Sequence, residues 1–328
     1  MGLSIDKISI HLPDQILSNE TLAAQFNVST SEILKRTGIE TRYLSAQNET
    51  ASDLAYTAGK KLLDAEPGLR EKIDFLIFCS DCFDYIAPAT SCILQNRLGL
   101  AQTTGCMDLP YGCSGFVYGL AIANGLLHTG MANTVLFLTC DTSTKTLNPN
   151  NFEQRSLFSD AGVATLLTKN ENTAVNSFIF GTDGSGAHDL YIEGSAFRAP
   201  LDKNFKKDEK LPYGEMVMDG TNIFSFALKT VPALVNNTLA KSGLTIDDID
   251  LFVFHQANGF ILETLRRKMN IPKEKFYTNI KDYGNTVAST IPLALYTANN
   301  EKVLRKGMKV LVAGFGVGNS WAATVINY

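Results

Sequence analysis

The sequence predicts an α/β fold built from two related halves. Its short apolar runs lack polar alternation, as strands buried on both faces do, and helix-like segments separate them. Three of these elements recur in the same order at nearly one spacing, which chance similarity of apolar segments rarely produces. The matched positions are Ile73 with Ile249, Tyr111 with Tyr283, and Val135 with Val310, at separations of 176, 172 and 175 residues. We therefore interpret the chain as an internal duplication.

The composition is that of a soluble globular enzyme. Of 328 residues, 45% are apolar and 19% are charged, and a net charge of −4 leaves no basic surface for nucleic acid. The sequence has no run of eighteen apolar residues that would span a membrane, and its N-terminus has no signal-peptide pattern. A cytoplasmic protein is expected.

Six cysteines are expected to be free thiols in a reducing compartment. Cys79 and Cys82 have the spacing of a metal or redox pair. A zinc site would need a second ligand pair at similar spacing, and thioredoxin-like chemistry would need the pair at a helix start. The sequence provides neither, so no metal or cofactor is predicted.

The first half carries the clearest helix. A strand over Cys106–Leu109 leads through Pro110 to an apolar helix predicted from Gly115 to Leu127. His128 in its last turn and Gly130 just beyond it mark the C-terminal end.

In the second half, a helix is predicted from Pro232 to Ser242, because Gly243 follows it and a strand begins near Asp250. The segment from Ala199 to Glu215 is rich in lysine and has proline near both ends. It is expected to be a solvent-exposed connection.

Cys113 lies in the turn that opens the predicted helix of the first half. Unpaired backbone N–H groups and the positive end of the helix dipole are expected there, and both would lower the pKa of the thiol and favour a nucleophilic thiolate. The alternative is a small residue that packs like alanine in a tight turn. Position alone does not separate the two.

Two further residues are candidates for the same chemistry. His255 ends the strand "DLFVF", where open α/β sheets place their ligands, although a histidine satisfied by backbone groups is an equal alternative. Asn285 opens the second repeated helix, where asparagine is commonly an N-cap. Pseudo-twofold symmetry would bring the starts of both repeated helices to one crevice. A single site of Cys113, His255 and Asn285 then explains all three residues.

A glycine-rich turn, "GFGVGNSW", follows the last predicted strand from Gly314. It lacks the Lys-Ser/Thr pair of a phosphate-binding loop. A backbone N–H donor for an oxyanion is the better interpretation.

Together, these motifs resemble the β-ketoacyl-acyl-carrier-protein synthase III family of the thiolase superfamily. "GCSGF" at Cys113, "HQAN" at His255 and "GNT" at Asn285 are similar to that family's nucleophile, histidine and asparagine motifs. Further similar stretches occur in the family's order over nearly the whole chain: "RTGIETR" (36–42), "TDGSG" (182–186), "MDGTNIFSFA" (218–227) and "FGVGNSW" (315–321). The resemblance implies a thiolase-like fold, with two duplicated α/β halves, 1–172 and 173–328, in a layered αβαβα core.

The resemblance also implies a condensing reaction and a role for each residue. Cys113 would be acylated by a thioester, and the backbone N–H groups of Cys113 and Val317 would stabilise the oxyanion. His255 and Asn285 would hydrogen-bond the thioester oxygen of a malonyl group during its decarboxylation. A neutral imidazole is needed for this, so the pKa of His255 is predicted to lie below its ordinary value of roughly 6.5.

The substrate contacts follow from the same resemblance. Thr221, Phe224 and Asn258 would line a pantetheine tunnel, and Ala87 stands where the partner subunit's aromatic residue often closes the acyl pocket. Acyl-coenzyme A, acyl carrier protein and malonyl carrier protein are the implied substrates of a homodimer that needs no cofactor. Arg267 and Lys268 would meet an acidic carrier protein, with an ordinary solvated helix face as the alternative.

The chain departs from the family pattern at several of these contacts. Glu32-Ile33 replaces a pair whose tryptophan would stack on adenine, and Arg155 is a candidate for the opposing clamp. Phe260 stands at a position that is commonly basic, and Val317 replaces a smaller residue. These changes favour delivery by carrier protein and a specialised product.

Two other functions are alternatives to condensation. A thiolase-fold acyltransferase would pass the acyl group from Cys113 to an alcohol or amine, but Asn285 favours decarboxylation. A silent partner subunit would have lost the nucleophile, and Cys113 is intact.

Overall fold

Two five-stranded sheets form the body of the protein. The computed structural model describes residues 2–170, 177–196 and 214–328. The first sheet has the order β1 (Gly2–His11), β7 (Ala161–Asn170), β6 (Thr134–Asp141), β4 (Phe75–Cys79) and β5 (Gly105–Leu109). The second has the order β8 (Phe178–Thr182), β14 (Ser320–Asn327), β13 (Lys309–Gly316), β11 (Leu251–Phe254) and β12 (Phe276–Tyr277).

The two sheets have the same topology. In each sheet, three neighbouring strands are parallel, and two further strands pair antiparallel beyond them. The parallel strands are β5, β4 and β6 in the first sheet and β12, β11 and β13 in the second. Phe75 lies opposite Val135 in the first sheet, and Leu251 lies opposite Val310 in the second. The strands predicted to repeat are therefore paired in the same register. The predicted boundary between residues 172 and 173 falls outside the described residues.

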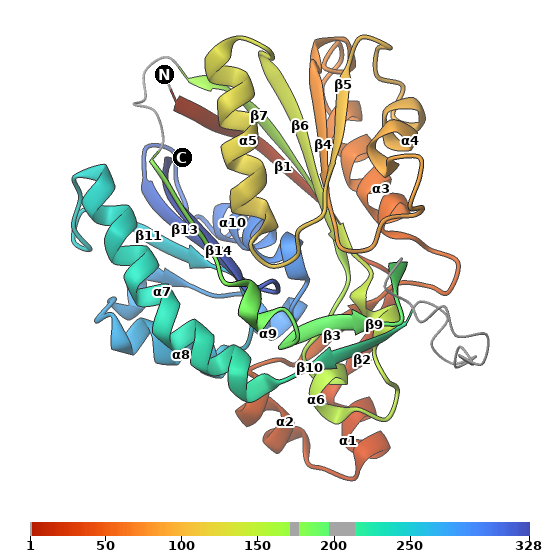
Figure 1. Ribbon diagram of the computed structural model, residues 1–328, viewed down its shortest axis with the longest axis vertical. Coiled ribbons are helices and arrows are strands. Elements are labelled where there is room, and N and C mark those ends of the chain that lie inside the picture. The colour runs from red at the N-terminus through yellow and green to blue at the C-terminus, as the bar shows by residue number, and fades with distance from the viewer. Residues whose placement is uncertain (1, 171–176, 197–213) are drawn as a thin grey trace.

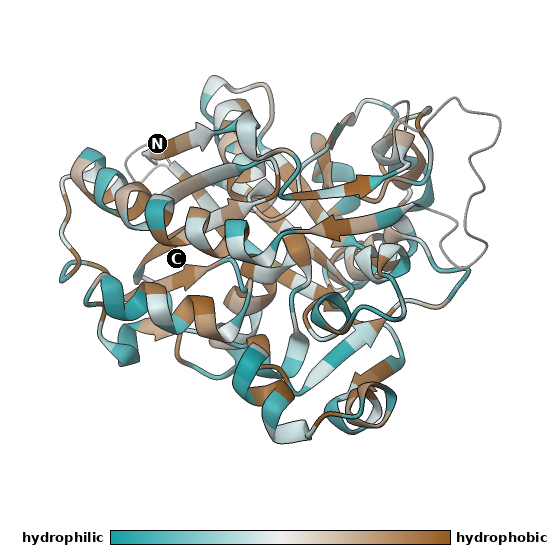
Figure 2. Cartoon of the chain, turned by 60° about the horizontal axis from the view of Figure 1, so that its bottom comes forward, coloured by the Kyte–Doolittle hydropathy of each residue, from teal (hydrophilic) through white to brown (hydrophobic). Residues whose placement is uncertain are grey.

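Helices cover both faces of each sheet and give the predicted αβαβα layers (Figure 1). Two helices pack between the sheets, namely α5 (Gly115–Thr129) and α10 (Thr290–Asn300). The outer layers are α3 (Ala51–Asp64) and α4 (Thr90–Arg97) on the first sheet, and α7 (Gly220–Ser242) and α8 (Gly259–Lys268) on the second. Figure 2 shows the apolar residues of these layers concentrated in the interior and polar residues on outward helix faces, as burial of apolar surface requires.

Shorter elements form a cap at one end of the sheets. They include β2 (Gln15–Ser18), α1 (Asn19–Phe26), α2 (Thr30–Thr37), β3 (Thr41–Leu44), α6 (Phe152–Arg155), β9 (Leu190–Glu193), β10 (Glu215–Met218) and α9 (Ile280–Tyr283). Short 3₁₀ turns are η1 (Arg70–Lys72), η2 (Ser143–Thr146), η3 (Gly184–Gly186), η5 (Lys273–Lys275) and η6 (Val287–Ser289). Buried Arg42 ties this cap together, because its guanidinium donates to Ser156 O at 2.6 Å and to Asn19 Oδ1 at 2.5 Å.

The helix predicted after Cys113 is confirmed. α5 begins at Gly115, and Gly130 ends it in the left-handed conformation at φ 75°. The strand predictions around it are confirmed as β4, β5 and β6.

The helix predicted from Pro232 is wrong at its start. α7 begins at Gly220, twelve residues earlier, and Pro232 lies inside it. Proline has no N–H for the carbonyl of the residue four positions before it, which here is Leu228. The Lys268 ammonium of α8 donates to Leu228 O at 3.0 Å instead, so the helix continues through the proline. The predicted connection over 199–215 lies outside the described residues except at its last two positions.

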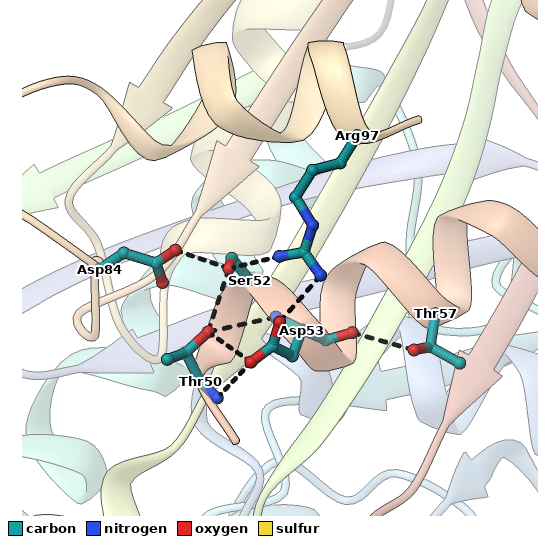
Figure 3. Close-up of polar contacts among 6 residues, drawn as sticks. All are labelled: Thr50, Ser52, Asp53, Thr57, Asp84 and Arg97. Carbon is teal, nitrogen blue, oxygen red and sulfur yellow. Dashed lines mark hydrogen bonds and ion pairs between the residues drawn. The ribbon is translucent and has the colours of Figure 1, made fainter. Parts of the chain in front are cut away.

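Figure 3 shows the polar network that starts α3. Thr50 Oγ1 accepts from Asp53 N at 3.3 Å, and Asp53 Oδ2 accepts from Thr50 N at 2.9 Å, which makes a capping box. Arg97 of α4 adds an ion pair to Asp53 at 2.8 Å and a hydrogen bond to Ser52 at 3.1 Å. This network joins both outer helices of the first sheet.

Replacing Thr50 with alanine is expected to lower the free energy of unfolding by about 1 kcal/mol, because Asp53 N loses its side-chain acceptor and keeps only Thr50 O. Urea denaturation followed by circular dichroism measures the change. Thr103→Ala is the matched control, since exposed Thr103 makes no side-chain hydrogen bond with the described residues. Equal denaturation midpoints for the two variants would contradict the capping role.

Candidate active site

One cavity of about 270 Å³ brings Cys113, His255 and Asn285 together. Cys113 comes from the turn between β5 and α5, His255 follows β11, and Asn285 precedes η6. Their exposed fractions are 5%, 1% and 6%. Segments that are far apart in the sequence thus meet around one cavity, and the three side chains are buried in its wall.

The Cys113 thiol is neutral at rest. The backbone N–H groups of Val317 and of Cys113 itself interact with the sulfur, and both lower its pKa. Burial and then the nearby Asp81 carboxylate act in the opposite direction, and together they raise the pKa to about 12. The lowered pKa expected from the helix start is therefore wrong, because loss of water outweighs the backbone groups.

A glycine allows the turn after β13 to approach the nucleophile. A Cβ atom at Gly316 would lie 2.5 Å from Cys113 Cβ and 2.7 Å from its sulfur. Ser114 and Ser320 share a hydrogen bond of 2.7 Å that fixes this turn against the start of α5. The N–H of Val317 is held beside the sulfur in this way.

His255 is held at the end of β11. Its backbone N–H donates to Ala313 O at 2.8 Å, and its Nδ1 lies 2.7 Å from Thr290 Oγ1. Thr290 Oγ1 also lies 3.0 Å from Val287 O, and its one hydrogen goes either to that carbonyl or to Nδ1; donation to Nδ1 places the proton of the neutral ring on Nε2. Burial lowers the pKa of His255 to about 3, in the direction predicted.

Asn285 has a fixed amide orientation. Its Oδ1 accepts from Val287 N at 2.9 Å, and its Nδ2 donates to Ala257 O at 3.3 Å. The second Nδ2 hydrogen remains for a ligand in the cavity. Asn285 does not open the regular helix as expected, because α10 begins five residues later at Thr290.

The predicted tunnel residues are only partly together. Phe224 and Asn258 line the cavity, and Asn258 Oδ1 also caps α8 through Phe260 N at 2.7 Å. Thr221 is exposed and does not line the cavity. Phe260 stacks on Phe224 with ring centroids 5.7 Å apart, so the mouth of the cavity is aromatic.

Comparison with known proteins gives the family. Residues 107–184 match the model of 3-oxoacyl-[acyl-carrier-protein] synthase III, and residues 239–328 match the model of its C-terminal part. The β-ketoacyl-[acyl-carrier-protein] synthase III of Clostridium perfringens (strain ATCC 13124) is 36% identical over 318 residues, which are 97% of this chain and 96% of that protein.

The chain belongs to the β-ketoacyl-acyl-carrier-protein synthase III family.

Solved structures of synthase III agree with this conclusion. A crystal structure of 3-oxoacyl-(acyl-carrier-protein) synthase III at 2.1 Å matches with a TM-score of 0.95 and 40% identity, covering 100% of both chains. The Thermus thermophilus synthase III matches with a TM-score of 0.89 and 34% identity, covering 99% of both. The predicted family, thiolase-like fold and class of acyltransferase condensing enzyme are confirmed.

The residues predicted to clamp adenine in synthase III enzymes do not face the cavity here. Ile33 is fully buried in the cap, and Glu32 forms an ion pair with Arg36 at 2.6 Å. Arg155 does not line the cavity, its Nε is buried without a partner among the described residues, and burial lowers its pKa. These residues therefore provide no surface on which adenine could stack, as the departure from the family pattern predicts.

The predicted docking cations lie on the far end of α8 from the cavity. Arg267 is exposed and pairs with Glu263 at 2.5 Å. Lys268 is exposed too, but it donates to the carbonyl freed by Pro232. Ala87 lies in an exposed loop and lines no part of the cavity.

Two findings bear on other kinds of function. Within residues 2–170, 177–196 and 214–328, no helix is long and apolar enough to cross a membrane. In the same part of the chain, no group of three or more His, Cys, Asp or Glu side chains is placed to hold a metal ion. Cys79 donates to Tyr111 O at 3.0 Å and packs inside the core.

The sequence did not indicate Thr290 or Asp141. Thr290 sets the hydrogen bonding of His255, and buried Asp141 accepts from Asp81 N at 2.7 Å and Ala288 N at 3.3 Å. Neither residue belongs to a motif with its own spacing, so only the fold reveals them.

Gly316→Ala is expected to slow acylation of Cys113 by at least about a hundredfold, because the added carbon displaces the nucleophile by a fraction of an ångström or more. Intact-mass kinetics with a saturating acyl thioester measures this. Gly125→Ala in α5 is the matched control, since a Cβ there meets no described atom within 4 Å. A Gly316→Ala variant as fast as the control would show that the close approach is unimportant.

His255 is expected to stay neutral from pH 5 to pH 8, because burial lowers its pKa to about 3. The unfolded chain binds this proton below roughly pH 6.5 and the folded chain does not, so stability falls as pH drops from about 6.5 toward 3. Nitrogen NMR of histidine-labelled protein, assigned with His255→Ala, follows the ring directly. A titration midpoint at pH 6 or above would refute the neutral ring.

Proposed function

We propose that Cys113 takes an acyl group from a thioester and joins it to a malonyl thioester to give a β-ketoacyl product. The observation that carries this proposal is the single cavity shared by Cys113, His255 and Asn285. Two backbone N–H groups at the sulfur support it. The thiol would serve as the nucleophile, the backbone N–H groups as oxyanion donors, and His255 with Asn285 as enolate donors.

In the first step, the Cys113 sulfur attacks the acyl thioester carbonyl. The N–H groups of Cys113 and Val317 stabilise the tetrahedral oxyanion. When the tetrahedral intermediate collapses, the bond between the acyl carbon and the sulfur of the donor thioester breaks. The donor's carrier leaves as a thiol with the proton that Cys113 gives up. The step forms one thioester and breaks one, so it balances without a cofactor, and we propose none.

In the second step, a malonyl thioester enters the same cavity and loses carbon dioxide. His255 Nε2–H and the free Nδ2–H of Asn285 donate to the thioester oxygen and stabilise the enolate. The enolate carbon attacks the acyl carbonyl, and Cys113 departs as a thiolate that regains a proton from solvent. A neutral His255 favours this step, because a cation would lose its proton to the enolate.

The fixed amide of Asn285 favours condensation over transfer to an alcohol or amine. Val287 N–H holds Oδ1, so the amide presents a donor rather than an acceptor to the cavity. A donor stabilises an enolate, whereas activation of an alcohol or amine requires a base. No described observation favours the transfer reaction.

We propose that phosphopantetheine arms reach Cys113 past Phe224 and Asn258, with acyl-coenzyme A or acyl carrier protein as donor and malonyl carrier protein as extender. The positions of Glu32, Ile33 and Arg155 offer adenine no stacking surface, which favours a carrier protein. Exposed Arg267 remains the candidate contact for its acidic surface.

We propose that the protein is a cytoplasmic homodimer. Each chain would consist of two related halves, residues 1–172 and 173–328. Tyr85 and Ile86 are 61% and 70% exposed beside Ala87, and β5 is an edge strand with Met107 37% exposed. A second copy would cover these apolar side chains. All six cysteines are free, which suits a reducing compartment.

Acylation followed by a malonyl chase tests the reaction. Acyl-coenzyme A and acyl-carrier-protein thioesters are expected to add an acyl mass to the wild type and not to Cys113→Ala. Malonyl carrier protein should then discharge that mass as a β-ketoacyl product. His255→Ala and Asn285→Ala are expected to keep acylation and to slow the discharge by at least about a hundredfold, as loss of oxyanion donors does elsewhere.

Acylation without discharge by malonyl thioester would replace the condensation with acyl transfer. If no thioester of the panel acylates Cys113, the proposed reaction is wrong.

A further inference from the structure

A second cavity, of about 420 Å³, is lined by Asp81, a residue that also touches the turn carrying Cys113. Its wall includes Asp81, Cys82, Thr142 and Thr146, and the exposed Tyr85–Ile86 segment. Asp81 belongs to the loop after β4, and its backbone N–H donates to Asp141 Oδ1 at 2.7 Å. That bond fixes the loop against the end of β6.

The Asp81 carboxylate touches the residue next to Cys113. A Cβ atom at Gly112 would lie 2.3 Å from Asp81 Oδ2, so the carboxylate rests directly on the Gly112 backbone. Its charge also raises the pKa of the Cys113 thiol. An acyl group on Cys113 would therefore have this carboxylate as a close neighbour.

Asp81 has no polar partner for its side chain in the described part of the chain, whereas the neighbouring acids do. Asp141 accepts from Ala288 N, and Asp160 accepts from Ser45 Oγ at 2.7 Å. Asp81 is exposed to the second cavity, and the surrounding protein raises the pKa of its carboxyl group. A ligand that covers this carboxyl group without donating to it takes it out of water unpaired, which is costly, whereas a ligand that donates to it removes that cost.

The inference rests on the proposed function in one respect. In both steps a pantetheine arm occupies the first cavity, so the acyl group on Cys113 needs separate space while the malonyl thioester binds. The second cavity meets the same Gly112–Cys113 turn through Asp81.

We propose that Asp81 is a specificity-determining residue that selects acyl groups carrying a hydroxyl or amino hydrogen-bond donor close to the thioester. Such a donor satisfies the carboxyl group when the acyl chain enters the second cavity. A plain alkyl chain of the same length covers the carboxyl group and leaves it unpaired, which disfavours that acyl group.

Competition between matched thioesters tests this specificity. The probes are butyryl, 2-hydroxybutyryl, 3-hydroxybutyryl and 3-aminobutyryl thioesters, each offered on coenzyme A and on carrier protein. The expected result for the wild type is a kcat/KM for acylation at least about tenfold higher for one donor-bearing probe than for butyryl. Asp81→Val should reverse that preference, and Asp81→Asn, which keeps an acceptor, should retain part of it for a hydroxyl group.

Asp84→Asn is the matched control, because Asp84 lines the same cavity but its Oδ2 already accepts from Ser52 at 2.6 Å (Figure 3). Its Oδ1 has no partner in the described part of the chain, but it is buried out of reach of a group in the cavity, so this substitution should leave the ratio between probes unchanged. Malonyl discharge of the butyryl form serves as a readout of folding and chemistry in each variant.

The inference is overturned if the wild type acylates with butyryl as fast as with every donor-bearing probe, or if Asp81→Val leaves the ratio unchanged while acylation proceeds. Failure of all probes to acylate Cys113 is a different result, since it overturns the proposed function and with it the inference that rests on it.

Discussion

The carboxylate of Asp141 is the interaction on which the active site depends. It ends β6 and accepts from Ser80 Oγ at 3.2 Å, from Asp81 N at 2.7 Å and from Ala288 N at 3.3 Å. Two of these donors come from the loop after β4 in the first half, and the third comes from the segment that leads into α10 in the second half. One buried carboxyl group therefore holds a loop from each half. Burial raises its pKa well above the ordinary value, and the three donors offset part of that cost. Apolar packing holds the layers together, and this polar junction sets how they meet at the site.

The junction supports a site in which the thiol of Cys113 and the imidazole of His255 are neutral at rest. Burial disfavours charged groups, so it raises the pKa of the Cys113 thiol and lowers the pKa of His255. The thiol therefore keeps its proton, and the imidazole stays neutral. The charges of the reaction then appear only in its transition states and intermediates. Backbone N–H groups, an amide and an imidazole N–H are already oriented toward them, and donors of this kind need no reorganisation when charge develops. The arrangement suits an enolate more than a stable ion.

Much of this could be predicted from the sequence, and the failures have physical causes. Repeated apolar runs predicted both sheets, because strands buried on two faces leave a pattern that survives divergence of the individual residues. The motifs at Cys113, His255 and Asn285 predicted which side chains share a cavity. Local patterns mislead where a distant group decides the outcome.

Pro232 resembles a helix start in the sequence, but the carbonyl that it leaves without a donor is satisfied by Lys268 of another helix. The pKa of Cys113 was misjudged because a helix start is local and burial is not. Asp81 and Thr290 carry no signal at all until the chain is folded.

The matching registers of the two parallel strand pairs have a consequence for divergence. Phe75 opposite Val135 and Leu251 opposite Val310 face the core between the sheets, and the next pairs along the strands, Leu76 opposite Leu136 and Phe252 opposite Leu311, face the outer cores. Insertion of one residue into any of these strands would exchange the side chains of two cores at once, so their lengths cannot drift. The cap has no such restriction, and its elements α2, α6, β9 and β10 supply Arg36, Phe152, Leu190 and Met218 to the cavity wall. Descendants of this fold can therefore gain or lose residues around the substrate while the reacting groups keep their places, and new substrates can arise without a new catalyst.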